Sequence, residues 1–166
     1  MSDSSFDPRE FRNALGRFAT GVTVVTTCDS EGNRLGLTVS SFNAVSMEPP
    51  LVLWSLDRGS STLPVFEAAS HFAVNVLGSD QTEISNRFAS REEDKFGELA
   101  CRDGAGGVPL LPDCVAHFEC KTVHRYDGGD HIIFVGQVEA FERRQGEALI
   151  FHDGSYCVAA AQPEAD

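Results

Sequence analysis

The sequence predicts a mainly-β protein, an antiparallel barrel with a few short flanking helices. About seven stretches have strand-like patterns, and they are short and closely spaced, as in antiparallel barrels. Two connections, at residues 29–33 and 126–130, are rich in Asp and Gly, which tolerate positive φ and favour hairpins. Close spacing of short strands disfavours a doubly wound parallel sheet, so we expect an antiparallel arrangement.

Length and charge limit the possible partners and location. The 166 residues fit one domain spanning 1–166, with flexible ends at 1–6 and 162–166. The net charge of −12 argues against nucleic acid and acidic membrane surfaces, both of which require basic patches. No apolar run approaches the roughly 20 residues that span a bilayer, and the N-terminus lacks a signal-peptide pattern. Five cysteines without a C-x-x-C pair predict free thiols, so we expect a cytoplasmic protein.

The first elements are a helix and a hairpin. Asp7 is a candidate N-cap, Pro8 occupies the first helical position, and Glu10 is the acid three residues after the cap. The helix should end near Thr20, and Phe11, Leu15 and Phe18 form its apolar stripe. The β-branched run at 22–27 predicts a strand, which the turn at 29–33 connects to the next strand.

The stretch from residue 34 to 56 organises the rest of the chain. Apolar and polar residues alternate from Leu37 until the phase slips at Ser40-Ser41, which predicts a strand that bends from one layer of a barrel to another. The pair Pro49-Pro50 then forces a turn. Residues 51–56 are apolar on both faces and predict a buried central strand, with Ser55 as its only hydroxyl.

The second half supplies the remaining elements. We expect helices over about 60–69 and 80–88 and strands over 71–77, 115–125 and 131–143, with short segments near 149–151 and 156–159. Arg87, Arg91 and Lys95 follow at intervals of four, so a continued helix would line them along one side. For Arg91, a solvated surface of ion pairs with the neighbouring acids is an equal alternative.

Several kinds of chemistry are disfavoured. Cys114, His117 and Cys120 have even spacing, but on a strand His117 would face away from both cysteines, so we expect no metal site. The Gly104-Ala105-Gly106 segment runs into Pro109 and lacks the strand-turn-helix context of a dinucleotide fingerprint. No nucleophile elbow or paired carboxylates stand out, which argues against a hydrolase.

Neutral hydroxyls and one basic residue remain as candidates. A helix start with free N–H groups and the hydroxyls of residues 60–62 suits a phosphate, to which Lys95 could add a charge-assisted contact. Capping and hydrogen bonding at strand edges explain the same serines, and residue types alone favour that interpretation. For His131 in Gly129-Asp130-His131, an ordinary turn histidine is likewise the simpler interpretation.

Six sequence segments, which follow one another in a fixed order, favour a functional role for these residues over a purely structural one. They are FRNALGRFATGVTVVTT (11–27), GLTVSSFNAVSMEPPLVLWSL (36–56), SST (60–62), KF (95–96), GDHIIFVGQV (129–138) and the F-H-x-G-x-Y ending (151–156). Together they resemble the flavin-reductase-like family, the reductase components of two-component flavin monooxygenases. The resemblance implies an FMN-binding split β-barrel of Greek-key type, a homodimer, FMN or FAD as cofactor, and NADH as hydride donor.

The resemblance also implies roles for single residues. The flavin-binding set is Thr38, Val39, Ser40, Ser41, Ser55 and Leu56 beside the ring and ribityl chain, and Ser60, Ser61, Thr62, Lys95 and Phe96 around the phosphate. His131 would be the catalytic residue that meets the nicotinamide, with Phe151 and Tyr156 on the same side.

The C-terminal motif departs from the family. Many relatives read Y-x-R-G-R-Y, whereas residues 151–156 read FHDGSY, so two expected cations are missing. Because this segment carries fewer positive charges, it should bind the extra phosphate of NADPH less well. The sequence therefore predicts an NADH-dependent flavin reductase that supplies reduced flavin to a monooxygenase. The alternative is a split-barrel flavoprotein that holds FMN tightly and acts on another small molecule.

Overall fold

The structure of the protein is a computed structural model that describes residues 6–164. The ends expected to be flexible, 1–6 and 162–166, lie mostly outside the described residues, and their flexibility stays a prediction. Among residues 6–164, no helix is both long and apolar enough to cross a bilayer.

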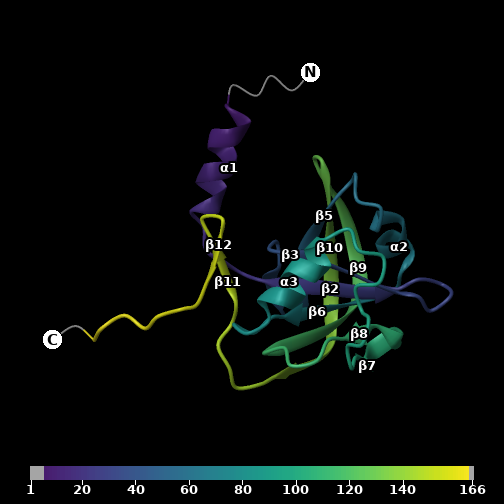
Figure 1. Ribbon diagram of the computed structural model, residues 1–166. Coiled ribbons are helices and arrows are strands. Elements are labelled where there is room, and N and C mark those ends of the chain that lie inside the picture. The colour runs from purple at the N-terminus through teal and green to yellow at the C-terminus, as the bar shows by residue number, and fades with distance from the viewer. Residues whose placement is uncertain (1–5, 165–166) are drawn as a thin grey trace.

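One seven-stranded sheet forms the body of the molecule (Figure 1). Every pairing in it is antiparallel, which confirms the predicted fold class. In spatial order its strands are β3 (Arg34–Val39), β2 (Thr23–Cys28), β6 (His71–Val76), β9 (Ala116–Gly128), β10 (His131–Arg143), β5 (Pro50–Asp57) and β4 (Asn43–Met47).

The bend at residues 40–42 forces this sheet to curl. β3 and β4 are consecutive in the chain, yet they lie at opposite edges of the sheet. Six strand spacings of about 4.8 Å would separate them by about 29 Å if the sheet were flat. The four Cα steps from Val39 to Asn43 reach at most about 14 Å. The edges must therefore approach each other, and the predicted change of layer at the phase slip is confirmed.

Aromatic packing fills the inside of the curl. The ring of Trp54 on β5 stacks on Phe134 of β10 with centroids 4.9 Å apart and meets Phe66 of α2 (Leu63–Ala68) edge-on at 4.9 Å. All three side chains are essentially buried. The prediction of a central strand over residues 51–56 is wrong in part, because β5 lies next to the edge strand and only Val52, Trp54 and Leu56 are buried.

The N-terminal helix stands apart from the sheet. α1 (Pro8–Gly16) begins as predicted, with the Asp7 side chain accepting a hydrogen bond from Arg9 N at 2.8 Å. It ends at Gly16 and not near Thr20, because Gly16 O accepts from Asp153 N and residues 20–21 form β1 (Thr20–Gly21). β1 pairs with β11 (Ile150–His152), which pairs with β12 (Ser155–Cys157). In Figure 1, α1 points away from the main sheet beside this small sheet.

Among residues 6–164, the apolar stripe of α1 stays largely exposed, although the ring of Phe6 stacks on that of Phe11. Phe11 is 54% exposed, Leu15 59% and Phe18 77%. The predicted stripe therefore exists, but it does not pack on the core of its own sheet.

The segment after α3 (Thr82–Ala89) is irregular. Ser90 terminates the helix in an extended conformation, and its hydroxyl donates to Arg87 O at 2.7 Å. The helix ends about where expected, so Arg91 and Lys95 do not form the row with Arg87 that a continued helix would have given. Because the Ser90 hydroxyl bonds a carbonyl of the last helical turn, it competes with the backbone hydrogen bonds that would extend the helix. This competition explains why α3 ends here.

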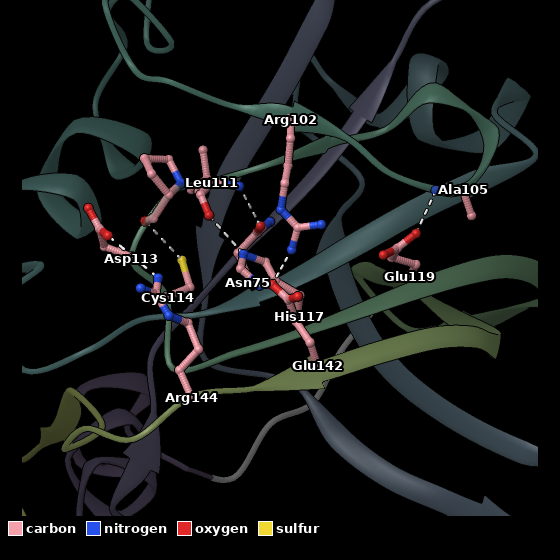
Figure 2. Close-up of polar contacts among 11 residues, drawn as sticks. Asn75, Arg102, Ala105, Leu111, Asp113, Cys114, His117, Glu119, Glu142 and Arg144 are labelled. Atoms are coloured by element: carbon pink, nitrogen blue, oxygen red, sulfur yellow. Dashed lines mark hydrogen bonds and ion pairs between the residues drawn. The ribbon is translucent and has the colours of Figure 1, made fainter.

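A long connection, residues 101–114, is fastened to the sheet by polar contacts (Figure 2). It contains β7 (Arg102–Asp103), the 3₁₀ turn η1 (Ala105–Gly107) and β8 (Pro109–Leu110). Asn75 Oδ1 accepts from Leu111 N at 2.9 Å, and Glu119 Oε2 accepts from Ala105 N at 2.6 Å. Residues 104–106 lead only into this short 3₁₀ turn, and the strand β8 follows it, so no α-helix of a dinucleotide fingerprint begins here.

Buried His117 lies at the centre of these contacts. Its Nε2 is 2.8 Å from Leu111 O, and its Nδ1 is 2.9 Å from Glu142 Oε1, an oxygen that Arg102 also contacts (Figure 2). Burial raises the pKa of both Cys114 and Cys120 to about 12, so these thiols stay protonated and are poor metal ligands. Among residues 6–164, no group of three His, Cys, Asp or Glu side chains could hold a metal ion.

The contacts of Glu142 predict a stability that depends on pH. Burial raises the pKa of Glu142, but the hydrogen bond and charge of Arg102 and of His117 outweigh burial, so the pKa lies below its ordinary value. The stabilisation is therefore complete above the ordinary carboxyl pKa and disappears as the pH falls through the lower, folded value. We expect Glu142→Gln to lower the free energy of unfolding by about 1 kcal/mol at pH 7, since the carboxylate is partly exposed.

Urea unfolding of the unchanged protein and of Glu142→Gln at a series of pH values measures the difference in their free energies of unfolding. This difference should shrink as the pH falls below the ordinary pKa of a glutamate. Glu98→Gln is the control, because Glu98 is exposed and makes no ion pair within the described part of the chain. A difference that stays constant into acid would contradict the assignment.

Candidate functional site

An open cavity of about 720 Å³ lies between β3, the loop after β5 and the segment after α3. Three stretches of the chain line it: Arg34–Thr38, Gly59–Thr62, and Phe88–Glu93 with Lys95 and Phe96. Of the residues predicted to bind flavin, the structure gathers Thr38, Ser60, Ser61, Thr62, Lys95 and Phe96 here.

Hydroxyl groups form one side of the cavity. Ser60 Oγ and Thr62 Oγ1 are hydrogen-bonded at 2.8 Å, and Thr62 N donates to Ser60 Oγ at 3.3 Å. Thr62 is the N-cap residue of α2 without a side-chain cap bond. Thr62 itself therefore does not cap α2, whereas Ser60 bonds the backbone just before the helix, so local hydrogen bonding accounts for part of these hydroxyls.

Charged side chains of both signs also line the cavity. Lys95 Nζ donates to Phe88 O at 3.2 Å. Burial lowers the pKa of Lys95, and the charge of Glu92 opposes this effect. Arg34, which sequence reasoning did not single out, also lines the cavity and contacts Asp103 at 3.3 Å. The cavity therefore offers cationic groups in a chain that is acidic as a whole.

Two phenylalanines give the cavity an apolar wall. The rings of Phe88 and Phe96 meet edge-to-face with centroids 5.1 Å apart. Phe88 also lies close to Gly36 of β3, where a Cβ atom would come within 3.0 Å of its ring. A glycine at this position lets α3 approach the strand, and no pattern in the sequence marked it.

The remaining predicted flavin residues surround the bend and do not line this cavity. Ser41 Oγ accepts a hydrogen bond from Ser55 N at 3.0 Å and donates to Ser55 O at 3.3 Å. Leu56 is buried in the core beneath them. Val39 ends β3 and Ser40 begins the bend, next to Thr38, which donates to Ser85 O at 2.6 Å. Their flavin contacts stay predictions.

The residues predicted on the nicotinamide side separate into two places. His131 begins β10 opposite Asp57 of β5, and its Nδ1 is 2.7 Å from Asp130 Oδ1. The hydrogen bond from His131 and its charge lower the pKa of Asp130. Tyr156 and Phe151 lie on the small sheet, where the Tyr156 hydroxyl bonds Ser85 Oγ at 2.7 Å. None of these three predicted side chains lines the cavity.

The donor set suits a planar ligand with a phosphate. Neutral hydroxyls can hydrogen-bond an uncharged ring edge or a phosphate, and a lysine adds a charge-assisted contact. The lining residues include no triad of nucleophile, base and acid. The chemistry that such a site favours is therefore that of a bound cofactor, positioned by the protein.

Comparison with known proteins identifies the family of the chain. The family described as "Flavin reductase like domain" matches residues 15–160. The chain belongs to this family.

Its relatives carry related names. An FMN reductase (NADH) of Agrobacterium fabrum is 47% identical over 148 residues, which is 89% of this chain and 84% of that protein. The reductase component of a trigonelline monooxygenase of Acinetobacter baylyi is 42% identical over 92% of this chain, which spans only 49% of that protein's length. An NADH:FAD oxidoreductase of Streptomyces globisporus, solved with NAD and FAD fragments, is 36% identical with a TM-score of 0.87, covering 96% of both chains.

Proposed function

We propose that this protein is an NADH-dependent flavin reductase that transfers a hydride from NADH to FMN or FAD and supplies reduced flavin to a partner monooxygenase. The observation that carries the proposal is a cavity lined by both the Ser60–Thr62 hydroxyls and Lys95, within a chain of the flavin reductase family. The matched region, 15–160, supports a single domain over 1–166.

In this proposal the chain's own residues position two rings. Ser60, Ser61, Thr62 and Lys95, which line the cavity, would hold the flavin phosphate, with Phe96 beside them. Thr38, Val39, Ser40, Ser41, Ser55 and Leu56 would lie beside the ribityl chain and the ring. When bound, the flavin supplies hydride acceptance, so the protein needs no strong acid or base. Stacking the two rings at near-contact distance is the main contribution of the protein.

His131 is the proposed residue on the nicotinamide side. Its Nδ1 is occupied by Asp130, which fixes the ring's orientation and leaves Nε2 available to a ligand. The side chain of His131 is 42% exposed, so a nucleotide can reach it. Phe151 and Tyr156 would line the same side once a nucleotide is bound, although they do not touch the cavity described above.

The C-terminal segment supports a preference for NADH. Asp153 contacts Arg17 of the neighbouring helix end at 3.1 Å, so an arginine from this region is already paired with an acid. The cations that many relatives carry here are replaced by Asp153 and Ser155. Little positive charge is left for the additional phosphate of NADPH.

We also propose a homodimer and a cytoplasmic location. The exposed stripe of Phe11, Leu15 and Phe18 on α1 is an apolar face that a second copy could cover. Free cysteines, all five within the described residues, fit a reducing compartment. Sedimentation equilibrium of the purified protein tests the first proposal, and a monomer at micromolar concentration would rule it out.

The second candidate is a flavoprotein of the same fold that retains FMN and acts on another small molecule. The polar and charged lining of the cavity would serve either protein. A yellow, stoichiometric flavin that remains through purification, together with slow NADH oxidation, would favour it.

The first test is NADH oxidation in air by the purified protein, with and without added FMN or FAD. We expect fast oxidation only when flavin is added, and a higher kcat/KM with NADH than with NADPH. Equal efficiency with the two nucleotides would contradict the nucleotide preference. No oxidation with either flavin would contradict the reductase proposal itself.

Replacing Lys95 tests the phosphate contact. We expect Lys95→Ala to weaken FMN binding by about 1–3 kcal/mol, the range for hydrogen bonds to charged groups. Titration of flavin fluorescence measures this loss. Riboflavin, which has no phosphate, should bind both proteins equally, and Lys121→Ala on β9 is the matched control because Lys121 does not line the cavity.

Replacing His131 tests the nicotinamide contact. We expect His131→Ala to raise the KM for NADH or to slow hydride transfer, while FMN affinity and the melting temperature stay nearly unchanged. Stopped-flow measurement of flavin reduction at several NADH concentrations separates the two effects. Unchanged kinetics would leave His131 as an ordinary turn residue.

A further inference from the structure

Arg58 joins two parts of the molecule that are far apart in the sequence. It follows β5 directly and reaches the β9–β10 hairpin through three hydrogen bonds. Its backbone N donates to Asp130 O at 2.9 Å, and its Nε donates to Gly129 O at 2.9 Å. Its Nη2 donates to the carboxylate of Asp127. One residue thus holds three positions of a single turn.

On one side, Arg58 continues directly into the hydroxyl loop of the cavity. Gly59 and Ser60 are its next neighbours, and both line the cavity, whereas Arg58 does not. Asp57 fixes their backbone, because its Oδ1 accepts from Gly59 N at 2.6 Å and its carbonyl accepts from Ser60 N at 3.0 Å. This short loop is therefore tied to Asp57 and directly joined to Arg58.

On the other side, Arg58 holds the residues that precede His131. Gly129 has a φ of 73°, a turn conformation that leaves its carbonyl free to accept from Arg58. Asp130 accepts from Arg58 through its backbone and contacts His131 Nδ1 through its side chain. The bond to Asp130 comes from the Arg58 backbone, whereas the guanidinium holds Gly129 and Asp127. The side chain of Arg58 therefore fixes the turn that immediately precedes Asp130 and His131.

The exposure of Arg58 argues against a purely structural role. Its side chain is 44% exposed and that of Asp127 is 88% exposed, so neither fills the core. Ion pairs this exposed contribute little to stability. Three bonds from one arginine to one turn are better explained by the position that they impose on it.

We propose that Arg58 is a positioning residue that couples the loop at the flavin phosphate to the placement of His131 at the nicotinamide. This inference rests on the proposed function, because it takes the Ser60–Thr62 loop as the phosphate site and His131 as the nicotinamide contact. A phosphate bound at the loop orders residues 59–62, and Arg58 transmits that order to the hairpin. Nucleotide binding then improves when the flavin carries a phosphate.

The experiment compares two flavins as hydride acceptors, FMN and riboflavin, which differ only in the phosphate. In the unchanged protein, the KM for NADH is expected to be lower with FMN, by about two- to tenfold, the effect of one hydrogen bond. In Arg58→Met, the two KM values should become equal, while the melting temperature changes little. Arg58→Lys keeps the charge beside Asp127 but lacks the planar fork, and should retain part of the difference.

Arg125→Met is the matched control. Arg125 lies on β9, and its Nη2 donates to Ala69 O at 2.9 Å, away from the loop and from His131. This variant should keep the full difference between FMN and riboflavin. Asp127→Asn provides a second route to the same test should Arg58→Met fail to fold, since it weakens the contact from the hairpin side.

The outcomes separate this inference from the proposed function. Equal KM values for NADH with FMN and riboflavin in the unchanged protein would overturn the coupling. The coupling would also be overturned if the difference in the KM for NADH between FMN and riboflavin persisted in Arg58→Met. The same holds if Arg125→Met also removed that difference. An unchanged protein that oxidises no NADH with either flavin would overturn the proposed function instead.

Discussion

The bend at residues 40–42 is the constraint on which the rest of the structure depends. It connects the two edge strands of the main sheet, β3 and β4, with a segment too short to cross a flat sheet. Curling brings the end of β3 close to β5, and the paired hydrogen bonds between Ser41 and Ser55 hold that approach. The cavity opens beside the same strand, between residues 34–38 and the loop that follows β5. The bend at residues 40–42 thus determines both the curl of the sheet and the position of the cavity.

Local sequence signals predicted most of the elements, because each signal acts within a few residues. Asp7 caps α1 by accepting a hydrogen bond from a backbone N–H two residues away. The turn at Gly129 requires a positive φ that glycine adopts readily. Residue types therefore suffice to predict both. The phase slip at Ser40-Ser41 is also local. What the sequence could not provide is the order of strands, since pairing between β2 and β6 joins segments about fifty residues apart.

The sequence predictions that were wrong failed because of contacts that form only in the folded structure. α1 ends early because Asp153, far along the chain, bonds its last carbonyl and β11 recruits Thr20. Arg91 and Lys95 form no row with Arg87, because Ser90 ends the helix. At the site, the hydroxyls and Lys95 could be predicted by resemblance, whereas Arg34 and Gly36 line the cavity only because β3 faces the segment after α3. Arg58 carried no signal at all, since its partners lie about seventy residues away.

The charges at the cavity bear on how tightly a flavin is held. The chain has a net charge of −12, so its long-range field repels an anionic ligand, and the local cations must offset that repulsion. Arg34, Arg91 and Lys95 do so, but Glu92 and Glu93 line the same cavity and reduce the local positive charge. Most of the remaining contacts are neutral hydroxyls, whose net hydrogen bonds contribute only about 1 kcal/mol each. With the flavin bound at the proposed site, this balance predicts modest affinity, which a reductase needs in order to release reduced flavin to another enzyme.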